Sequence, residues 1–206
     1  MENEAHWYAV KVFYNRVFDM EARLNPYGIE TYVASNAVKV EGRDHSSALK
    51  KLADENDHLA HRMYVQIGPV IYKKKPLVNS LLFARADKDQ LAILEGFMQD
   101  KDSGKKYGFI YKDSSWKNYS KIPDKQIEDF RRVTSSGDTG LKIYTGDKII
   151  NFKTGDKVRV TDGPLKGTEG YIKRINKDRR LLVCIEGVIA VATSYIPQKQ
   201  LEKVTD

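Results

Sequence analysis

The stretch that decides the fold of the C-terminal part is residues 153–176, KTGDKVRVTDGPLKGTEGYIKRIN. A Gly-Asp turn signal precedes a short β-branched run, and a second such run follows a glycine-rich connection. Glycine is favoured where the backbone takes a positive φ or where another chain segment approaches closely, so this pattern predicts a hairpin with a crowded connection. The defining positions are Gly155, Asp156, Val158, Val160, Gly163, Pro164, Gly167 and Gly170.

Charged side chains alternate with apolar ones along this hairpin, as Lys157, Arg159 and Lys173 show. The alternation predicts one buried face and one basic face exposed to solvent. More short β-branched runs follow, which favours a small all-β barrel over residues 152–206, because closing the sheet removes its exposed edges. A charged turn of the kind that contacts RNA or an acidic protein surface consists of Lys177, Arg179 and Arg180.

The first 135 residues alternate between strand-like and helix-like patterns. Residues 6–13 and 29–40 are rich in β-branched and aromatic residues, whereas residues 15–27 have apolar side chains three or four positions apart. This opening predicts a β-α-β unit. Further helices are expected at residues 44–63, 87–99 and 123–133, with strands at residues 64–72, 78–86 and 105–112 between them. We therefore expect an α+β domain at 1–135, an antiparallel sheet flanked by helices, a linker at 136–151 and the all-β domain at 152–206.

Composition narrows the class of protein. The net charge is +7, of which the residues after Ile150 contribute +4, and this favours a polyanionic partner. No apolar run is long enough for a membrane span, and the N-terminal residues do not resemble a signal peptide. The single cysteine, Cys184, excludes an internal disulfide and fits a reducing compartment. We expect a cytoplasmic protein that does not bind membranes.

Motifs for catalysis are not recognisable in the sequence. Asp54, His58 and His61 could share one helical face, but a tetrahedral zinc site needs more ligands and usually a second element. A phosphate-binding Gly-Lys-Ser/Thr loop, a Gly-x-Ser-x-Gly elbow and a spaced Cys/His pair are all missing. We expect no enzymatic activity, no metal site and no cofactor.

Residues 153–176 resemble the KOW motif, and the whole arrangement resembles the NusG family of transcription elongation factors. In that family an NGN domain is followed by a linker and a KOW barrel. Trp7-Tyr8 stands at the position of the family's first strand, Lys75–Arg85 at a conserved sheet strand, and Ile122-Pro123-Asp124 at the start of the last NGN helix. The segments KPLVNSLLFAR (75–85), IPDKQIEDF (122–130) and GTEGYIKRINKDRRLLVCIEG (167–187) resemble the specialised RfaH and UpxY-type regulators of polysaccharide operons more closely. The chain also lacks the Phe-Pro-Gly-Tyr stretch of the general factor, with Val-Asn-Ser-Leu at 78–81 instead, and it carries an extra helical stretch at 44–63.

The resemblance implies binding to the clamp helices of RNA polymerase through an apolar depression on the NGN sheet. The matching positions are Val78, Leu81 and Phe83, with ordinary core packing as the alternative. Binding of this kind is not catalysis, because it shifts the population of polymerase towards one state. Trp7 is expected to be a core residue rather than a contact.

Two basic groups are candidates for binding non-template DNA or nascent RNA. Arg16 and Arg23 are seven residues apart on one helix, and the alternative is a solvated face on which Asp19 pairs with them locally. The run Lys73, Lys74 and Lys75 is either a DNA-contacting loop or a solvated hairpin tip.

The function implied by the resemblance is antitermination, with read-through of a long operon for polysaccharide biosynthesis. The KOW domain would then bind a ribosomal protein or the termination factor Rho. Two alternatives stay open: a KOW-containing accessory protein that binds the ribosome or RNA, and the general NusG elongation factor.

Overall fold

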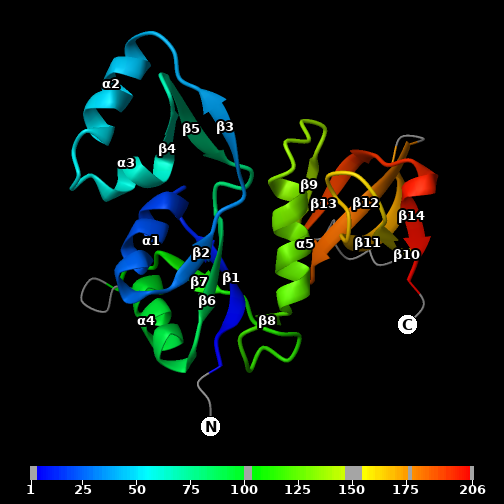
Figure 1. Cartoon of the computed structure of the whole chain (residues 1–206). Helices are drawn as coiled ribbons and strands as arrows, with labels where there is room; N and C mark the ends of the chain where they lie inside the picture. The colour runs from blue at the N-terminus through cyan, green and yellow to red at the C-terminus, as the bar shows by residue number, and fades with distance from the viewer. Residues whose placement is uncertain (1–3, 100–103, 147–154, 176–177, 205–206) are drawn as a thin grey trace. The chain divides into compact units, whose positions relative to one another are not determined.

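The computed structural model describes residues 4–99, 104–146, 155–175 and 178–204. The chain divides into two compact units, Met1–Lys121 and Ile122–Asp206, which are described separately (Figure 1). Both are built on antiparallel sheets, and the first also contains most of the helices. In the described ranges, no helix has the length and apolar character needed to cross a membrane.

The first unit is organised around an antiparallel sheet in the order β2-β6-β1-β7, and a short strand, β8, lies beside β1. The strands alternate with helices along the chain, as the β-α-β pattern at its start predicts. The elements of this part are β1 (His6–Val12), α1 (Val17–Leu24), the 3-10 turn η1 (Asn25–Tyr27), β2 (Glu30–Tyr32), β6 (Leu81–Ala86), α4 (Lys88–Met98), β7 (Gly108–Ile110) and β8 (Lys121–Ile122).

Helices α1 and α4 pack on one face of this sheet and form its main core. Alternate residues of β1 and β6, including Val10 and Leu82, meet Leu24 of α1 and Leu94 of α4, and all four are fully buried. Helix α4 begins at a capping box in which the carboxylate of Asp87 accepts hydrogen bonds from the first turn. The helix expected at residues 87–99 is therefore confirmed.

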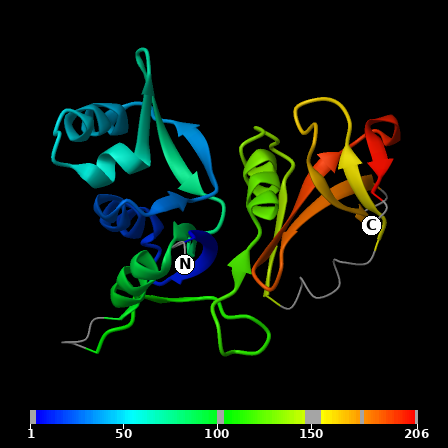
Figure 2. The ribbon, with the colours of Figure 1, turned by 60° about the horizontal axis from the view of Figure 1, so that its bottom comes forward.

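A second, smaller sheet is inserted between β2 and β6. Its strand order is β3-β5-β4, and helices α2 and α3 lie on one of its faces, as Figures 1 and 2 show. We call the elements β3 to β5 the inserted module. They are β3 (Ser35–Lys39), α2 (Arg43–Leu52), α3 (His58–Met63), β4 (Tyr64–Ile67) and β5 (Val70–Pro76).

In and around the inserted module, three segments that the sequence pattern predicts as single elements each form two elements. The single helix expected at residues 44–63 is two helices, because Asp57 accepts a hydrogen bond from the backbone N–H of Ala60 and caps a new helix there. The strand expected at residues 64–72 is a hairpin, with Gly68 at a φ of 56° in its turn. The strand expected at residues 29–40 is split between the two sheets as β2 and β3.

The second unit contains helix α5 (Asp124–Thr134) and a six-stranded antiparallel sheet in the order β14-β10-β11-β12-β13-β9. Closure of this sheet into a barrel stays a prediction. Its strands are β9 (Lys142–Thr145), β10 (Lys157–Val160), β11 (Glu169–Ile175), β12 (Asp178–Ile185), β13 (Ile189–Tyr195) and β14 (Leu201–Lys203), with the 3-10 turn η3 (Gln198–Gln200) before the last strand.

The division into units differs from the boundary expected near residue 135. Helix α5 was expected to close the first domain, but it packs on β12 and β13. Strand β9 falls inside the expected linker, residues 136–151, and pairs with β13. The physical reason is that α5 and β9 have partners in the C-terminal sheet, and an amphipathic pattern alone does not specify the partner.

Candidate functional site

The expected polymerase-contact residues lie on β6 or just before it. Register and alternation place Leu81 and Phe83 on the sheet face opposite the α1–α4 core. Their side chains are only 6% and 1% exposed, and the ring of Phe83 stacks on that of Tyr32 with centroids 6.5 Å apart. The structure therefore differs from the expectation of an open patch at these two residues. Val78 is partly exposed, and Trp7 is buried, as expected.

The arginine pair lies at helix α1 on either side of an acidic residue. The carboxylate of Asp19 is 3.7 Å from Nε of Arg16 and 3.2 Å from Nε of Arg23. Both guanidinium side chains are about half exposed, so these ion pairs contribute little to stability. The local pairing considered as the alternative is present, and it leaves one net positive charge for a polyanion.

The lysine run lies in strand β5 and not at a hairpin tip or in a loop, which corrects the expected placement. Strand β5 is the central strand of its sheet, so successive lysines point to opposite faces. The ammonium of Lys73 lies 5.8 Å from the ring centre of Tyr64. Burial raises the pKa of Glu21, and the positive charges of Arg62 and Lys74 act against that rise. Lys73 and Lys75 therefore share one face of the sheet and Lys74 lies on the other, and DNA binding by these lysines stays a prediction.

The glycines of the KOW-like hairpin behave as the sequence pattern predicts. Gly163 and Gly167 have φ values of 81° and 82°, in the left-handed region. A Cβ on Gly170 would lie 2.3 Å from the carbonyl oxygen of Leu182 on the paired strand, and one on Gly155 would lie 2.5 Å from that of Ile172. The close pairing of β11 with β12 therefore depends on the missing side chain at position 170.

The expected basic turn is mostly engaged within its own unit. Arg180 has a side chain only 13% exposed, and it donates hydrogen bonds to the backbone oxygens of Gly140 and Thr193. Arg179 donates to the side-chain oxygen of Gln198. Lys177 lies outside the described residues. Arg180 thus joins backbone segments of its own unit, and little of its side chain is exposed to contact RNA.

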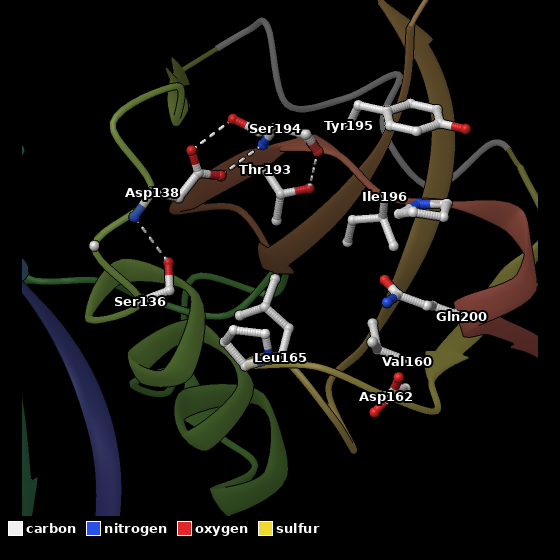
Figure 3. A pocket seen from close by; sticks show the side chains of 13 residues that line it. Ser136, Asp138, Val160, Asp162, Leu165, Thr193, Ser194, Tyr195, Ile196 and Gln200 are labelled. Carbon is white, nitrogen blue, oxygen red and sulfur yellow. Dashed lines mark hydrogen bonds between the residues drawn. The ribbon is translucent and has the colours of Figure 1, made fainter.

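The second unit contains a cavity of about 300 Å³ between the connection that follows β10 and the end of β13. Figure 3 shows the residues that line it. Its wall is mainly apolar, with Val160, Leu165 and Ile196 among the residues that line it. Asp138 lies at one side, where its carboxylate accepts hydrogen bonds from the hydroxyl and the backbone N–H of Ser194, both 2.6 Å long.

Asp138 also accepts a 2.8 Å hydrogen bond from the backbone N–H of Gly140. Burial alone would raise the pKa of Asp138, but the hydrogen bonds from Ser194 and Gly140 and the charge of Arg180 hold it below its usual value. We call this arrangement the Asp138 clasp. It fastens the segment after α5 to strand β13 and so fixes one wall of the cavity.

Helix α5 is attached to the KOW-like hairpin by a buried carboxylate. The side chain of Asp129 is 4% exposed, and its Oδ1 accepts a 2.6 Å hydrogen bond from Nζ of Lys125. The same Nζ donates to the backbone oxygen of Gly167 in the hairpin connection, at 2.9 Å. Burial raises the pKa of Asp129, whereas the Lys125 ammonium and a backbone hydrogen bond from Glu169 act against the rise.

One surface of the first unit was not predicted from the sequence. Phe109 on the edge strand β7 is 45% exposed, and Trp116 in the following loop is 77% exposed. Phe109 pairs with Lys11, which pairs with Leu81, so it lies on the face that carries the expected polymerase contacts. The signal that could have found this surface is the interleaving of five lysines with five aromatic residues over residues 104–121.

Comparison with known proteins identifies the hairpin. Residues 154–184 match the family model described as the KOW motif, so the second unit carries a KOW motif. This match covers the crowded glycine connection and strands β10, β11 and most of β12.

A solved structure entitled "Domain interaction in Thermotoga maritima NusG" is similar to the whole chain. The two are 12% identical, the alignment covers 98% of each chain, and the TM-score is 0.39. A likeness at this level carries no functional argument. No curated protein matches the sequence.

Proposed function

We propose that this chain is a non-enzymatic transcription regulator of the NusG type, which binds elongating RNA polymerase through its first unit. The observation that carries the proposal is the KOW motif at 154–184, placed after an α+β unit that opens with a β-α-β pattern. The proposal assigns the chain no metal or cofactor, because its action is to bind and stabilise one state of polymerase.

The finer proposal is a specialised, cytoplasmic regulator that promotes read-through of a long polysaccharide operon, similar to RfaH and UpxY-type proteins. The inserted module supports a specialised rather than a general factor, because it supplies elements beyond a simple sheet with two helices. The KOW unit would bind a ribosomal protein or Rho. Non-template DNA would meet the Arg16–Arg23 pair, which is half exposed.

We propose that polymerase contacts the face of β6 that carries Leu81 and Phe83. Since both side chains are buried here, direct contact by them requires that their exposure increases on binding. Val78 is already partly exposed and is the residue to test first.

The test is capture of core RNA polymerase by the full chain at moderate salt. The variant Val78→Asp should weaken capture, because a charge desolvated at an apolar contact is costly. The matched control is Val65→Asp on β4, which is 37% exposed and lies in the inserted module. Capture that fails for the unmodified chain, or that both variants weaken equally, would contradict the proposed contact.

A KOW-containing accessory protein that binds structured RNA is the second candidate. The excess charge of +4 after Ile150 favours it, because phosphate contacts need basic residues. Tight binding of structured RNA by the full chain, without capture of polymerase, would support this candidate and reject the first.

A further inference from the structure

The edge of the first unit's main sheet presents exposed aromatic rings together with lysines. Strand β7 is the last strand in the order β2-β6-β1-β7. All five lysines of residues 104–121 are exposed, and the one acidic residue among these positions is Asp113. We call the segment 104–121, together with Phe13 and Tyr14, the aromatic edge.

Four rings of the aromatic edge, those of Tyr14, Phe13, Phe109 and Tyr111, form a connected series. Phe109 lies 6.1 Å from Phe13 and 5.3 Å from Tyr111, measured between ring centroids. Phe13 is in turn 6.2 Å from Tyr14, which is 65% exposed. The ammonium of Lys105 lies 5.5 Å from the centre of the Tyr14 ring, as in a cation–π contact. Apolar faces and positive charge therefore alternate over one continuous surface.

A rigid turn presents Trp116 to solvent. The carboxylate of Asp113 accepts hydrogen bonds from the backbone N–H and the hydroxyl of Ser115, at 3.0 and 2.6 Å. The backbone of Asp113 pairs with that of Asn118, and Lys112 forms a bridge with Tyr119 at the base of the turn. These hydrogen bonds hold the backbone of the turn, and Trp116 at its tip is 77% exposed.

Backbone strain occurs at two residues of the aromatic edge and at the residue that follows Tyr14. In the described part of the chain, three residues other than glycine have φ in the left-handed region: Tyr14 at 61°, Asn15 at 55° and Trp116 at 60°. Such conformations cost about 1–3 kcal/mol each and persist where the surrounding structure enforces them, often at functional sites. Two of the three are the most exposed rings of the aromatic edge.

The need to prevent an edge strand from pairing with another chain does not explain why exposed aromatic residues and lysines occur together here. Lysines alone suffice to discourage pairing of an edge strand with another chain, whereas exposed Phe and Trp would promote association. Aromatic rings that alternate with lysines are instead typical of a site for single-stranded nucleic acid. Proteins bind single-stranded nucleic acid by stacking bases on aromatic side chains while basic residues follow the phosphates.

We propose that the aromatic edge is a binding site for single-stranded nucleic acid, with bases stacked on Phe109 and Trp116 and phosphates held by the lysines. The site needs no polymerase, so it stands or falls independently of the function proposed above. The charge of the segment makes it complementary to a polyanion, and a stacking site of this kind has little sequence preference.

Binding is measured with the full chain by fluorescence anisotropy of labelled oligo(dT) and oligo(U) of about 15 nucleotides, within the range of known site sizes. Comparing the two shows whether DNA or RNA is preferred. Phe109→Ala and Trp116→Ala should each weaken binding by roughly fivefold or more. The matched control is Tyr27→Ala, which removes an aromatic side chain that is 50% exposed and packs on Phe97 of α4.

The lysines are tested by salt dependence. The double variant Lys105→Ala/Lys117→Ala should lower the slope of log K against log salt by about 0.7 for each phosphate that is no longer neutralised. The control is Lys50→Ala/Lys51→Ala on α2, which removes the same charge from another exposed position. Circular dichroism confirms that each variant is folded.

Intrinsic fluorescence gives an independent readout. The chain has two tryptophans, and Trp7 is only 4% exposed, so quenching on addition of oligo(dT) reports on Trp116. Quenching that Trp116→Phe abolishes, while binding is retained, supports the proposal.

Three outcomes would overturn it. The first is equal binding of single strands and of a duplex of the same length. The second is loss of binding in the lysine variants but not in the aromatic ones, which would indicate general electrostatic attraction. The third is that the aromatic variants lose capture of polymerase but bind the oligonucleotides as well as the original chain does, which would make the surface a protein-docking site.

Discussion

Replacing Asp138 with alanine should destabilise the second unit without unfolding the first. The change removes three hydrogen bonds to a carboxylate, two from Ser194 and one from Gly140. Each such bond to a charged group contributes about 1.5–3 kcal/mol. Because Asp138 is partly exposed and water can replace some of these donors, we expect a total loss of about 2–3 kcal/mol.

The assay is differential scanning calorimetry of the full chain at neutral pH. For a unit of this size, about 1 kcal/mol shifts the melting midpoint by roughly 4–8 °C, so the transition of the second unit should fall by about 10–20 °C. Asp162→Ala is the matched control, since Asp162 also lines the cavity but is exposed. It should change the midpoint by only a few degrees.

The stability difference between the original chain and Asp138→Ala should depend on pH. The pKa of Asp138 is lower in the folded unit than its usual value, so the clasp contributes stability above the unfolded pKa and loses it as the pH falls through the folded pKa. The difference between the original chain and Asp138→Ala should therefore shrink below about pH 4. A variant as stable as the original chain at neutral pH, or a difference that grows in acid, would refute the reasoning.

Two further predictions concern the KOW unit. Lys125→Ala leaves the buried carboxylate of Asp129 without its closest cation and should cost about 3 kcal/mol by denaturant unfolding, whereas Lys166→Ala, on an exposed lysine, should cost little. Adding Asp129→Asn to Lys125→Ala should recover part of the loss, and no recovery would contradict a role for the buried charge. Gly170→Ala places a Cβ 2.3 Å from a backbone oxygen and should prevent close pairing of β11 with β12, seen as loss of strand signal in circular dichroism. Gly187→Ala meets no atom within 4 Å and should cost only about 1 kcal/mol for its positive φ, so equal damage from both would argue against the steric explanation.

Local signals in the sequence predicted the elements well where one residue type dictates the geometry. Asp87 marks the start of α4 because its side chain satisfies backbone donors there, and the glycines of the KOW motif mark positive φ or close approach. The hairpin of β4 and β5 was missed although Gly68-Pro69 is a turn signal. That error placed Lys73 to Lys75 outside a strand.

Long-range packing could not be predicted in the same way. Strand β6 is buried on both faces, so its run of apolar residues does not indicate which side chains are available to a partner. The spacing of apolar residues in α5 identifies a buried face but not the sheet that covers it. The aromatic edge has no periodic signal in the sequence, because the pairing of β1 with β7 brings Phe13 and Phe109 together from distant parts of the chain.

The inserted module leaves and rejoins the main sheet at neighbouring points. Ser35 pairs with Pro76, and the backbone N–H of Leu77 donates to the oxygen of Ala34 at 2.8 Å. The two ends of the segment are therefore as close as the ends of a tight turn, and β2 and β6 need only a short bridge between them. Evolution can lengthen, shorten or exchange everything between Ala34 and Leu77 while the rest of the sheet keeps its pairing. Related chains are free to acquire new recognition elements at this one point.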